Sequence, residues 1–109
     1  MIKILVVNIM NKIPKEILDK YSGEGRTVNF DRIPVGKAID FVGVYGKIPK
    51  REYWKGVEKI DFGDGIQFRF MYWTRKVGTK NWVWGQFNLC LSKDLLEKLL
   101  KEMERKGWI

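Results

Sequence analysis

Two neighbouring stretches in the middle of the chain alternate their side chains as β-strands do. In residues 66–74 one face is apolar, whereas the other mixes cations with large planar groups. The apolar positions are Ile66, Phe68, Phe70 and Tyr72. The opposite positions are Gln67, Arg69, Met71 and Trp73, continued by Arg75. Residues 81–91 repeat the pattern, with Val83, Phe87, Leu89 and Leu91 on one face and Trp82, Trp84, Gln86 and Asn88 on the other.

A turn at Gly78-Thr79 joins these two strands and sets their register. The pairs that result include Ile66–Leu91, Phe68–Leu89, Phe70–Phe87, Tyr72–Gly85 and Trp73–Trp84. A slip of one residue would move every side chain to the opposite face, so the pattern specifies this register well.

Residues 57–62 predict the preceding strand, which Gly63-Asp64-Gly65 joins to residue 66. We predict a three-residue loop, because Gly65 can adopt the left-handed conformation and because this length sets Ile60 opposite Phe68. A two-residue loop would place Asp61 on the apolar face instead.

The C-terminal residues predict the clearest helix. Ser92 is a favourable N-cap, Asp94 lies in the first turn, and Gly107 ends the helix. One face of the helix is a leucine stripe, made of Leu95, Leu96, Leu99, Leu100 and Met103.

The N-terminal half is less regular. The apolar run Ile2–Ile9 predicts a buried strand, and Pro14 begins a short amphipathic helix that ends near Tyr21. Residues 27–30 predict another strand. Residues 35–45 fit either a strand or a helix, and their β-branched content and Gly43 favour a strand. Pro49 and the dense charge of residues 46–56 predict an exposed loop.

Together these elements predict a single α+β domain over residues 1–109. We expect two layers: an antiparallel sheet of about five strands, with a short N-terminal helix and a longer C-terminal helix on one face. No remaining element is long enough to cover the opposite face fully. The tryptophan side chains of the central hairpin would then be exposed.

The chain is strongly basic, and the charge is concentrated. There are 21 Lys and Arg against 13 Asp and Glu, a net charge of +8, and residues 47–80 alone carry nine cations and four acids. Such a surface favours polyanionic partners, although solubility alone can also account for it. Abundant Lys, Glu and Ile with no His is a composition typical of proteins from hot environments.

Several kinds of chemistry are excluded or disfavoured by composition. The absence of histidine excludes imidazole bases and His-ligated metals, and the single Cys90 excludes an internal disulfide. We expect Cys90 to be a structural thiol on the tryptophan face. Asp40, Glu52, Glu58, Asp61 and Asp64 match no specific metal site, so we expect no cofactor and no metal.

The N-terminal apolar run lacks a small-residue cleavage site, and no run reaches membrane-spanning length. We therefore expect a cytoplasmic protein without a membrane partner.

An aromatic surface beside cations suggests a small nucleic-acid-binding protein, because bases stack on aromatic rings while cations attract phosphates. Single-stranded DNA or RNA is the favoured partner. The candidate nucleic-acid-binding residues are Lys50, Arg51, Trp54, Arg69, Met71, Trp73, Arg75, Lys76, Lys80, Trp82, Trp84 and Gln86.

Two alternatives remain open. The same face could be a protein-interaction or homodimer surface, because Trp and Arg are enriched at interfaces. A ribonuclease without histidine is a weaker alternative, with Tyr53, Tyr72, Arg51 and Arg75 as its candidate residues. We expect no enzymatic activity, because no general base is apparent.

Overall fold

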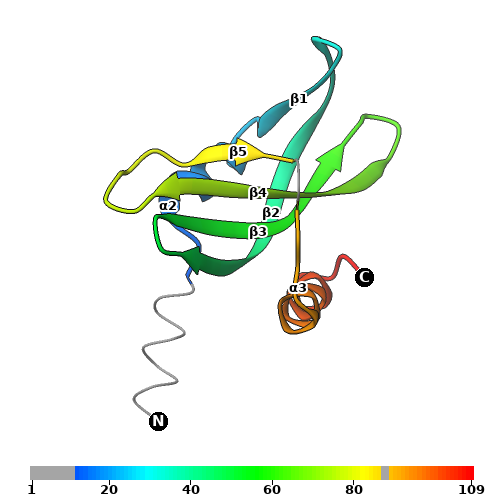
Figure 1. Ribbon diagram of the computed structural model, residues 1–109. Helices are drawn as coiled ribbons and strands as arrows, with labels where there is room; N and C mark the ends of the chain where they lie inside the picture. Colours follow the sequence, from blue (N-terminus) through cyan, green and yellow to red (C-terminus); the bar gives the residue numbers. More distant parts are fainter. Residues whose placement is uncertain (1–11, 87–88) are drawn as a thin grey trace.

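Five antiparallel strands in sequential order form a curled sheet, shown in Figure 1. The computed structural model describes residues 12–86 and 89–109, so the predicted strand Ile2–Ile9 lies outside the described residues. The strands are β1 (Arg26–Phe30), β2 (Ile33–Ile48), β3 (Arg51–Asp61), β4 (Ile66–Lys76) and β5 (Val83–Gly85). The helices are α2 (Lys15–Leu18), the 3-10 helix η1 (Asp19–Tyr21) and α3 (Lys93–Arg105). The predicted antiparallel α+β class is confirmed.

The second and third strands form a long hairpin that sequence analysis divided wrongly. Residues 35–45 are strand, as favoured, but residues 46–56 are not a loop, because β2 continues to Ile48 and β3 begins at Arg51. Only Pro49 and Lys50 form the turn between them. Proline is tolerated there because a turn position needs no ladder hydrogen bond.

The predicted loop between β3 and β4 is wrong by one residue. The N–H of Phe62 donates to the carbonyl of Gly65 over 2.9 Å, which leaves Gly63 and Asp64 as a two-residue turn. The left-handed position is taken by Gly63, at φ +88°, and its N–H donates to the Asp61 carboxylate over 2.8 Å. This turn sets Ile60 opposite Gln67, not opposite Phe68.

The register between β4 and β5 is confirmed where the two strands pair. Trp73 lies opposite Trp84 and Tyr72 opposite Gly85. A side chain at Gly85 would lie 2.5 Å from the tyrosine ring, so glycine is needed there. The predicted strand is nevertheless too long, since β5 ends at Gly85 and Leu89 and Leu91 lie in irregular backbone. The expected pairs of Phe87 and Asn88 lie outside the described residues.

The curled sheet has a separate hydrophobic cluster on each face. The inner cluster contains Ile17, Tyr21, Val28, Ala38, Phe41, Trp54, Ile60, Met71 and Trp73. The outer cluster contains Val42, Val44, Val57, Leu99 and Met103. The short N-terminal helices therefore belong to the inner cluster and α3 to the outer one, so the expectation that both helices share one face is not confirmed.

Helix α3 begins and ends as its sequence indicates. The N–H of Leu95 donates to the Ser92 hydroxyl over 3.2 Å, and Gly107 has φ +76° at the C-terminal end. Its stripe is only partly covered, because Leu99 is buried while Leu96 and Leu100 are about 40% exposed (38% and 41%). Phe68 of β4 contributes to the contact by stacking on Trp108.

Trp73 is buried and Phe70 on the opposite face of β4 is partly exposed, the reverse of the prediction from the sequence, and this difference can be tested. Trp73→Ala should lower the free energy of unfolding by about 3–5 kcal/mol, because the indole is 4% exposed in the inner cluster. Phe70→Ala is the matched control on the opposite face of the same strand. Its ring is 45% exposed, so the loss should be clearly smaller in chemical denaturation. Equal losses would contradict this arrangement of the two faces.

Candidate nucleic-acid interface

The tryptophan side of the sheet faces inward, not outward. Met71 and Trp73 are buried, with 0% and 4% of their surface exposed, and Trp54 is buried at 2%. The prediction that this face is uncovered is therefore wrong for these three side chains. The sheet curls around them, and Ile17 and Tyr21 pack on them from the N-terminal helices.

A fully buried carboxylate lies at the centre of the inner face. Glu58 of β3 accepts hydrogen bonds from the guanidinium groups of Arg26 on β1 and Arg69 on β4, at 2.6 Å and 3.0 Å from their Nη2 atoms. It also accepts from the Tyr21 hydroxyl over 2.6 Å, and that oxygen accepts from the Trp73 indole N–H over 3.0 Å. One carboxylate thus connects two strands on either side of β3 with η1.

The same two arginines enclose a tryptophan of the last strand. The guanidinium carbon of Arg26 lies 4.6 Å from the centre of the Trp84 ring, and that of Arg69 lies 4.7 Å from it. These cation–π contacts bring β1 and β5, the first and last strands, together. Trp84 is half-buried and already in contact with both guanidinium groups.

A second charge network lies further along the inner face. Arg75 donates to the Glu52 carboxylate over 2.7 Å and stacks on Trp82, with 4.5 Å between the guanidinium carbon and the ring centre. The Tyr45 hydroxyl donates to the same carboxylate over 2.9 Å. The hydrogen bond from Arg75 lowers the pKa of Glu52 from its ordinary value, so this carboxylate is ionised at neutral pH.

These networks change how the candidate residues can act. Arg69 and Arg75 are already paired with carboxylates, although Arg69 shares Glu58 with Arg26. Gln86 is exposed at the end of β5. The remaining candidates Lys50, Arg51 and Lys76 lie away from the inner face, whereas Lys80 lines a hollow with Glu16, Asp19 and Trp82.

The three candidates that lie away from the inner face meet on the outer side of the sheet, beside two tyrosines. We call this surface the tyrosine face and define it by Arg51, Tyr53, Lys55, Tyr72 and Lys76. Tyr53 and Tyr72 are half-buried, with ring centres 5.8 Å apart and planes at 65°. The ammonium of Lys55 lies 5.7 Å from the centre of the Tyr53 ring.

Strand pairing explains why the tyrosine face is free of acids. Lys55 lies opposite Tyr72, and Arg51 lies opposite Lys76, so the cations and rings alternate on one surface. Glu52 occupies an intervening position of β3 and points to the inner face, where it meets Arg75. The other outward-facing residues of this half of the sheet that the structure describes are neutral: Val44, Gly46, Ile48, Thr74, Val83 and Gly85.

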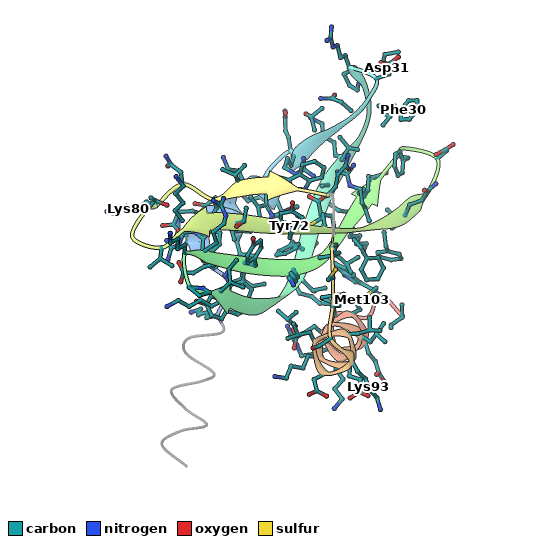
Figure 2. All side chains as sticks on the ribbon, in the orientation of Figure 1. Phe30, Asp31, Tyr72, Lys80, Lys93 and Met103 are labelled. Atoms are coloured by element: carbon teal, nitrogen blue, oxygen red, sulfur yellow. The ribbon has the colours of Figure 1, made fainter. Side chains whose placement is uncertain are left out.

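Two loops add cations at one end of this face. The N–H of Val77 donates to the carbonyl of Lys50 over 3.1 Å, which holds the β2–β3 turn beside the β4–β5 loop. Lys80, labelled in Figure 2, projects from the second loop at the same end of the sheet, and Tyr72 lies on β4 inward from it. Lys50 therefore extends the cationic surface beyond the tyrosines, whereas Lys80 also lies beside Glu16 and Asp19.

Sequence analysis missed this surface because it placed Tyr53 and Lys55 in a loop. The signal was present, since Arg51, Tyr53 and Lys55 alternate with Glu52 and Trp54 at strand spacing. Cys90 was also misplaced: it is exposed, and its carbonyl accepts a hydrogen bond from Lys55 over 2.7 Å.

Within residues 12–86 and 89–109, no group of three or more acidic or cysteine side chains is arranged to hold a metal ion. In the same ranges, no helix combines the length and the apolar character needed to cross a membrane. No family model, curated protein or solved structure matches the chain.

The buried carboxylate should dominate the stability of the inner face. Glu58→Gln should lower the free energy of unfolding by about 3–5 kcal/mol, because two partly buried guanidinium groups lose their counter-charge. Glu102→Gln is the control, since it removes an exposed ion pair to Arg105 and should change stability little. A Glu58→Gln variant as stable as the wild type in urea would contradict this role.

The Tyr21 hydroxyl should make the protein sensitive to alkali. Burial, reinforced by the charge of Glu58, raises the pKa of Tyr21 well above its ordinary value of 10.0. The unfolded chain therefore releases this proton above pH 10 while the folded chain keeps it, so stability falls as pH rises. The loss should approach about 1.4 kcal/mol per pH unit.

The Tyr21→Phe variant isolates this effect from the titration of lysines, which both proteins share. The unfolding free energy of each should be measured between pH 9 and 11. The wild type should show the steeper decline above pH 10. Parallel curves would show that Tyr21 titrates alike in the folded and unfolded chains.

Proposed function

We propose that this protein binds single-stranded nucleic acid on the tyrosine face. The observation that carries the proposal is an acid-free surface on which Tyr53 and Tyr72 lie among Arg51, Lys55 and Lys76. Aromatic rings stack on bases of any sequence, and neighbouring cations neutralise phosphates. This moves the proposed surface from the tryptophans to the opposite face of the same strands.

The two faces differ in the cations that they can offer to a phosphate. On the inner face, Arg26 and Arg69 share Glu58, and Arg75 is paired with Glu52. On the tyrosine face Lys76 has an exposed side chain, and Lys50 and Lys80 are exposed in the adjoining loops. Binding of a phosphate there releases counterions without breaking an internal ion pair, so the outer face supports binding better.

The residues around the two tyrosines are small, which also favours a single strand. Gly46 and Gly85 add no side chain, and Thr74 between the tyrosines is small and 8% exposed. Tyr53 and Tyr72 lie on the neighbouring strands β3 and β4, with ring centres 5.8 Å apart and planes at 65°. Bases must separate somewhat to reach both rings, which an unpaired strand does more easily than a duplex.

The proposal predicts two separable kinds of variant. Tyr53→Ala and Tyr72→Ala should each weaken binding to a single-stranded oligonucleotide by about 1–3 kcal/mol and leave the salt dependence unchanged. Lys50→Gln, Lys76→Gln and Lys80→Gln should instead each reduce the slope of log affinity against log salt, by about 0.7 for every phosphate that the variant no longer neutralises. Fluorescence anisotropy with DNA and RNA oligonucleotides at several salt concentrations measures both quantities.

Two control variants accompany this experiment. Phe30→Ala removes an aromatic ring that is 76% exposed at the tip of the β1–β2 hairpin (Figure 2), and Lys93→Gln removes a cation from α3. Neither should alter affinity. If Trp82→Ala or Trp84→Ala weakens binding more than the tyrosine variants do, the binding surface is the one that contains Trp82 and Trp84.

The same assay separates the alternatives. A wild type that binds no oligonucleotide in low salt would overturn the proposal, and a dimer in sedimentation that Tyr72→Ala dissociates would favour a protein interface. The ribonuclease alternative gains one observation, because Tyr53, Tyr72 and Arg51 lie on one face. We expect labelled RNA to be recovered intact, and cleavage abolished by Tyr53→Phe would replace binding with catalysis.

A further inference from the structure

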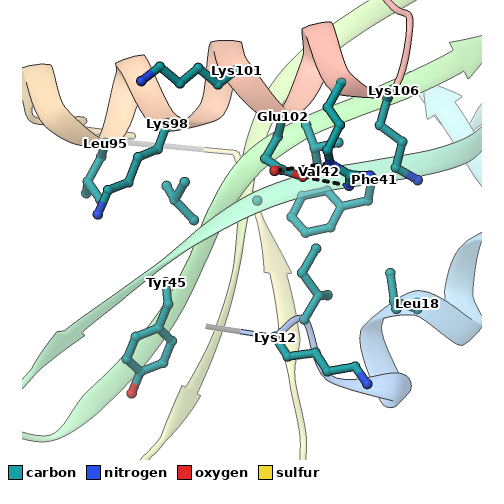
Figure 3. Close-up of a pocket in the computed structure, with 14 residues that line it drawn as sticks. Lys12, Leu18, Phe41, Val42, Tyr45, Leu95, Lys98, Lys101, Glu102 and Lys106 are labelled. Atoms are coloured by element: carbon teal, nitrogen blue, oxygen red, sulfur yellow. Dashed lines mark hydrogen bonds and ion pairs between the residues drawn. The ribbon is translucent and has the colours of Figure 1, made fainter. Parts of the chain in front are cut away.

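A groove of about 590 Å³ runs over β2 between α3 and the N-terminal helices. Figure 3 shows Lys98 and Lys101 of α3 and Lys106 just after it along one side, and Lys12 and Leu18 along the other, with Val42 and Phe41 between them. The lining is mainly apolar and includes Ile13, Leu18, Phe41, Val42, Val44, Tyr45 and Leu95. The groove adjoins the tyrosine face, since Val44 lies opposite Lys55, but none of the residues that define that face lines it.

The groove follows a strand edge to which no other described strand is paired. β1 pairs with β2 only between Ile33 and Ala38, whereas β2 continues to Ile48. From Asp40 onward, β2 pairs with β3 on one side alone. Unpaired strand edges attract another strand, and proteins usually cover them.

The direction of the free backbone groups follows from one hydrogen bond. The N–H of Phe41 donates to the Asp40 side chain over 2.8 Å, so it points away from β3. Alternate residues of a strand direct their backbone groups to the same side, and β2 pairs with β3 without irregularity from Asp40 to Ile48. The N–H and carbonyl groups of Gly43 and Tyr45 therefore also point away from β3, and both residues line the groove.

Both hydrophobic clusters reach this groove. Phe41 and Ile13 belong to or pack against the inner cluster. Val42, Val44 and Leu95 belong to or pack against the outer cluster. A strand lying here would contact the inner cluster with one face and the outer cluster with the other, so it would need apolar side chains on both.

One segment of the chain has that pattern. Residues 2–9 contain four consecutive apolar side chains at positions 4–7, a pattern typical of a strand that is covered on both faces. Met10 and Asn11 alone separate this segment from Lys12, which lines the groove. Its eight residues match the nine-residue free edge at about 3.4 Å per residue. The one charge in the segment, Lys3, lies at the end remote from Lys12.

We propose that residues 2–9 of the same chain add a strand to the free edge of β2 in this groove. Main-chain hydrogen bonds to Gly43 and Tyr45 would hold the strand, and the apolar residues 4–7 would join the two clusters. The short connection raises the local concentration of the segment far above that of any free peptide. A second copy or an extended apolar peptide of a partner is the competing occupant.

Amide hydrogen exchange of the full-length wild type tests this directly. Val42 and Val44 direct their N–H groups to β3, so they are internal references for the protected side of β2. If the strand is added, the amides of Gly43 and Tyr45 should be protected to within about tenfold of those references. Rapid exchange at Gly43 and Tyr45 beside protected references would overturn the proposal.

Substitutions in the segment identify the strand. In a strand, the side chains of Val6 and Val7 lie on opposite faces, and each would contact one hydrophobic cluster. Val6→Asp and Val7→Asp should therefore each reduce protection of the Gly43 and Tyr45 amides by at least about tenfold, while the Val42 and Val44 amides stay protected. Ile33→Asp is the matched control, because Ile33 is 63% exposed at a hairpin tip, and it should change neither.

Two further measurements distinguish residues 2–9 from the other possible occupants of the groove. Both use the wild type, so they do not depend on whether a variant folds. Nuclear Overhauser contacts from the methyl groups of Val6 and Val7 to Leu18 and Leu95 should be present, and their absence would contradict the proposal. Protection at Gly43 should not change on dilution. Protection that falls on dilution would assign the strand to another copy and overturn the intramolecular assignment.

Discussion

The buried carboxylate of Glu58 is the interaction on which the arrangement of the sheet depends. A charge without solvent is costly unless it is paired, and Glu58 is paired with Arg26 and Arg69 and hydrogen-bonded by Tyr21. These contacts require β1, β4 and η1 to lie around the Glu58 carboxylate of β3. The curl of the sheet is the geometry that meets this requirement, and the two arginines then enclose Trp84.

This internal pairing also sorts the positive charge of the protein. The basic residues of the inner face compensate Glu58 and Glu52, so they contribute structure more than surface potential. Among the described residues, the cations Arg51, Lys55 and Lys76 of the tyrosine face have no acid beside them on that face, and they contribute to the surface potential that a polyanion would meet. The proposed binding surface therefore follows from which side of each strand holds its carboxylates.

The length of the turn between β3 and β4 determines which face of the sheet each side chain occupies. A two-residue turn at Gly63 and Asp64, in place of three residues, sets Ile60 with Met71 and Trp73 instead of with Phe68. Because strand side chains have a period of two, that shift exchanges the core face and the solvent face. The aromatic residues expected on the surface are buried, and half-buried Tyr53 and Tyr72 take their place outside.

Local patterns determined much of this protein on their own: the antiparallel class, the register of Trp73 against Trp84, and helix α3 with its Ser92 cap. These depend on neighbours in sequence, so alternation and capping reveal them. Only the tertiary structure decided which sheet face is the core, because both faces of β4 are apolar or aromatic and the sequence does not show curvature. The pairing of Glu58 with Arg26 likewise joins residues 32 positions apart, beyond any local pattern.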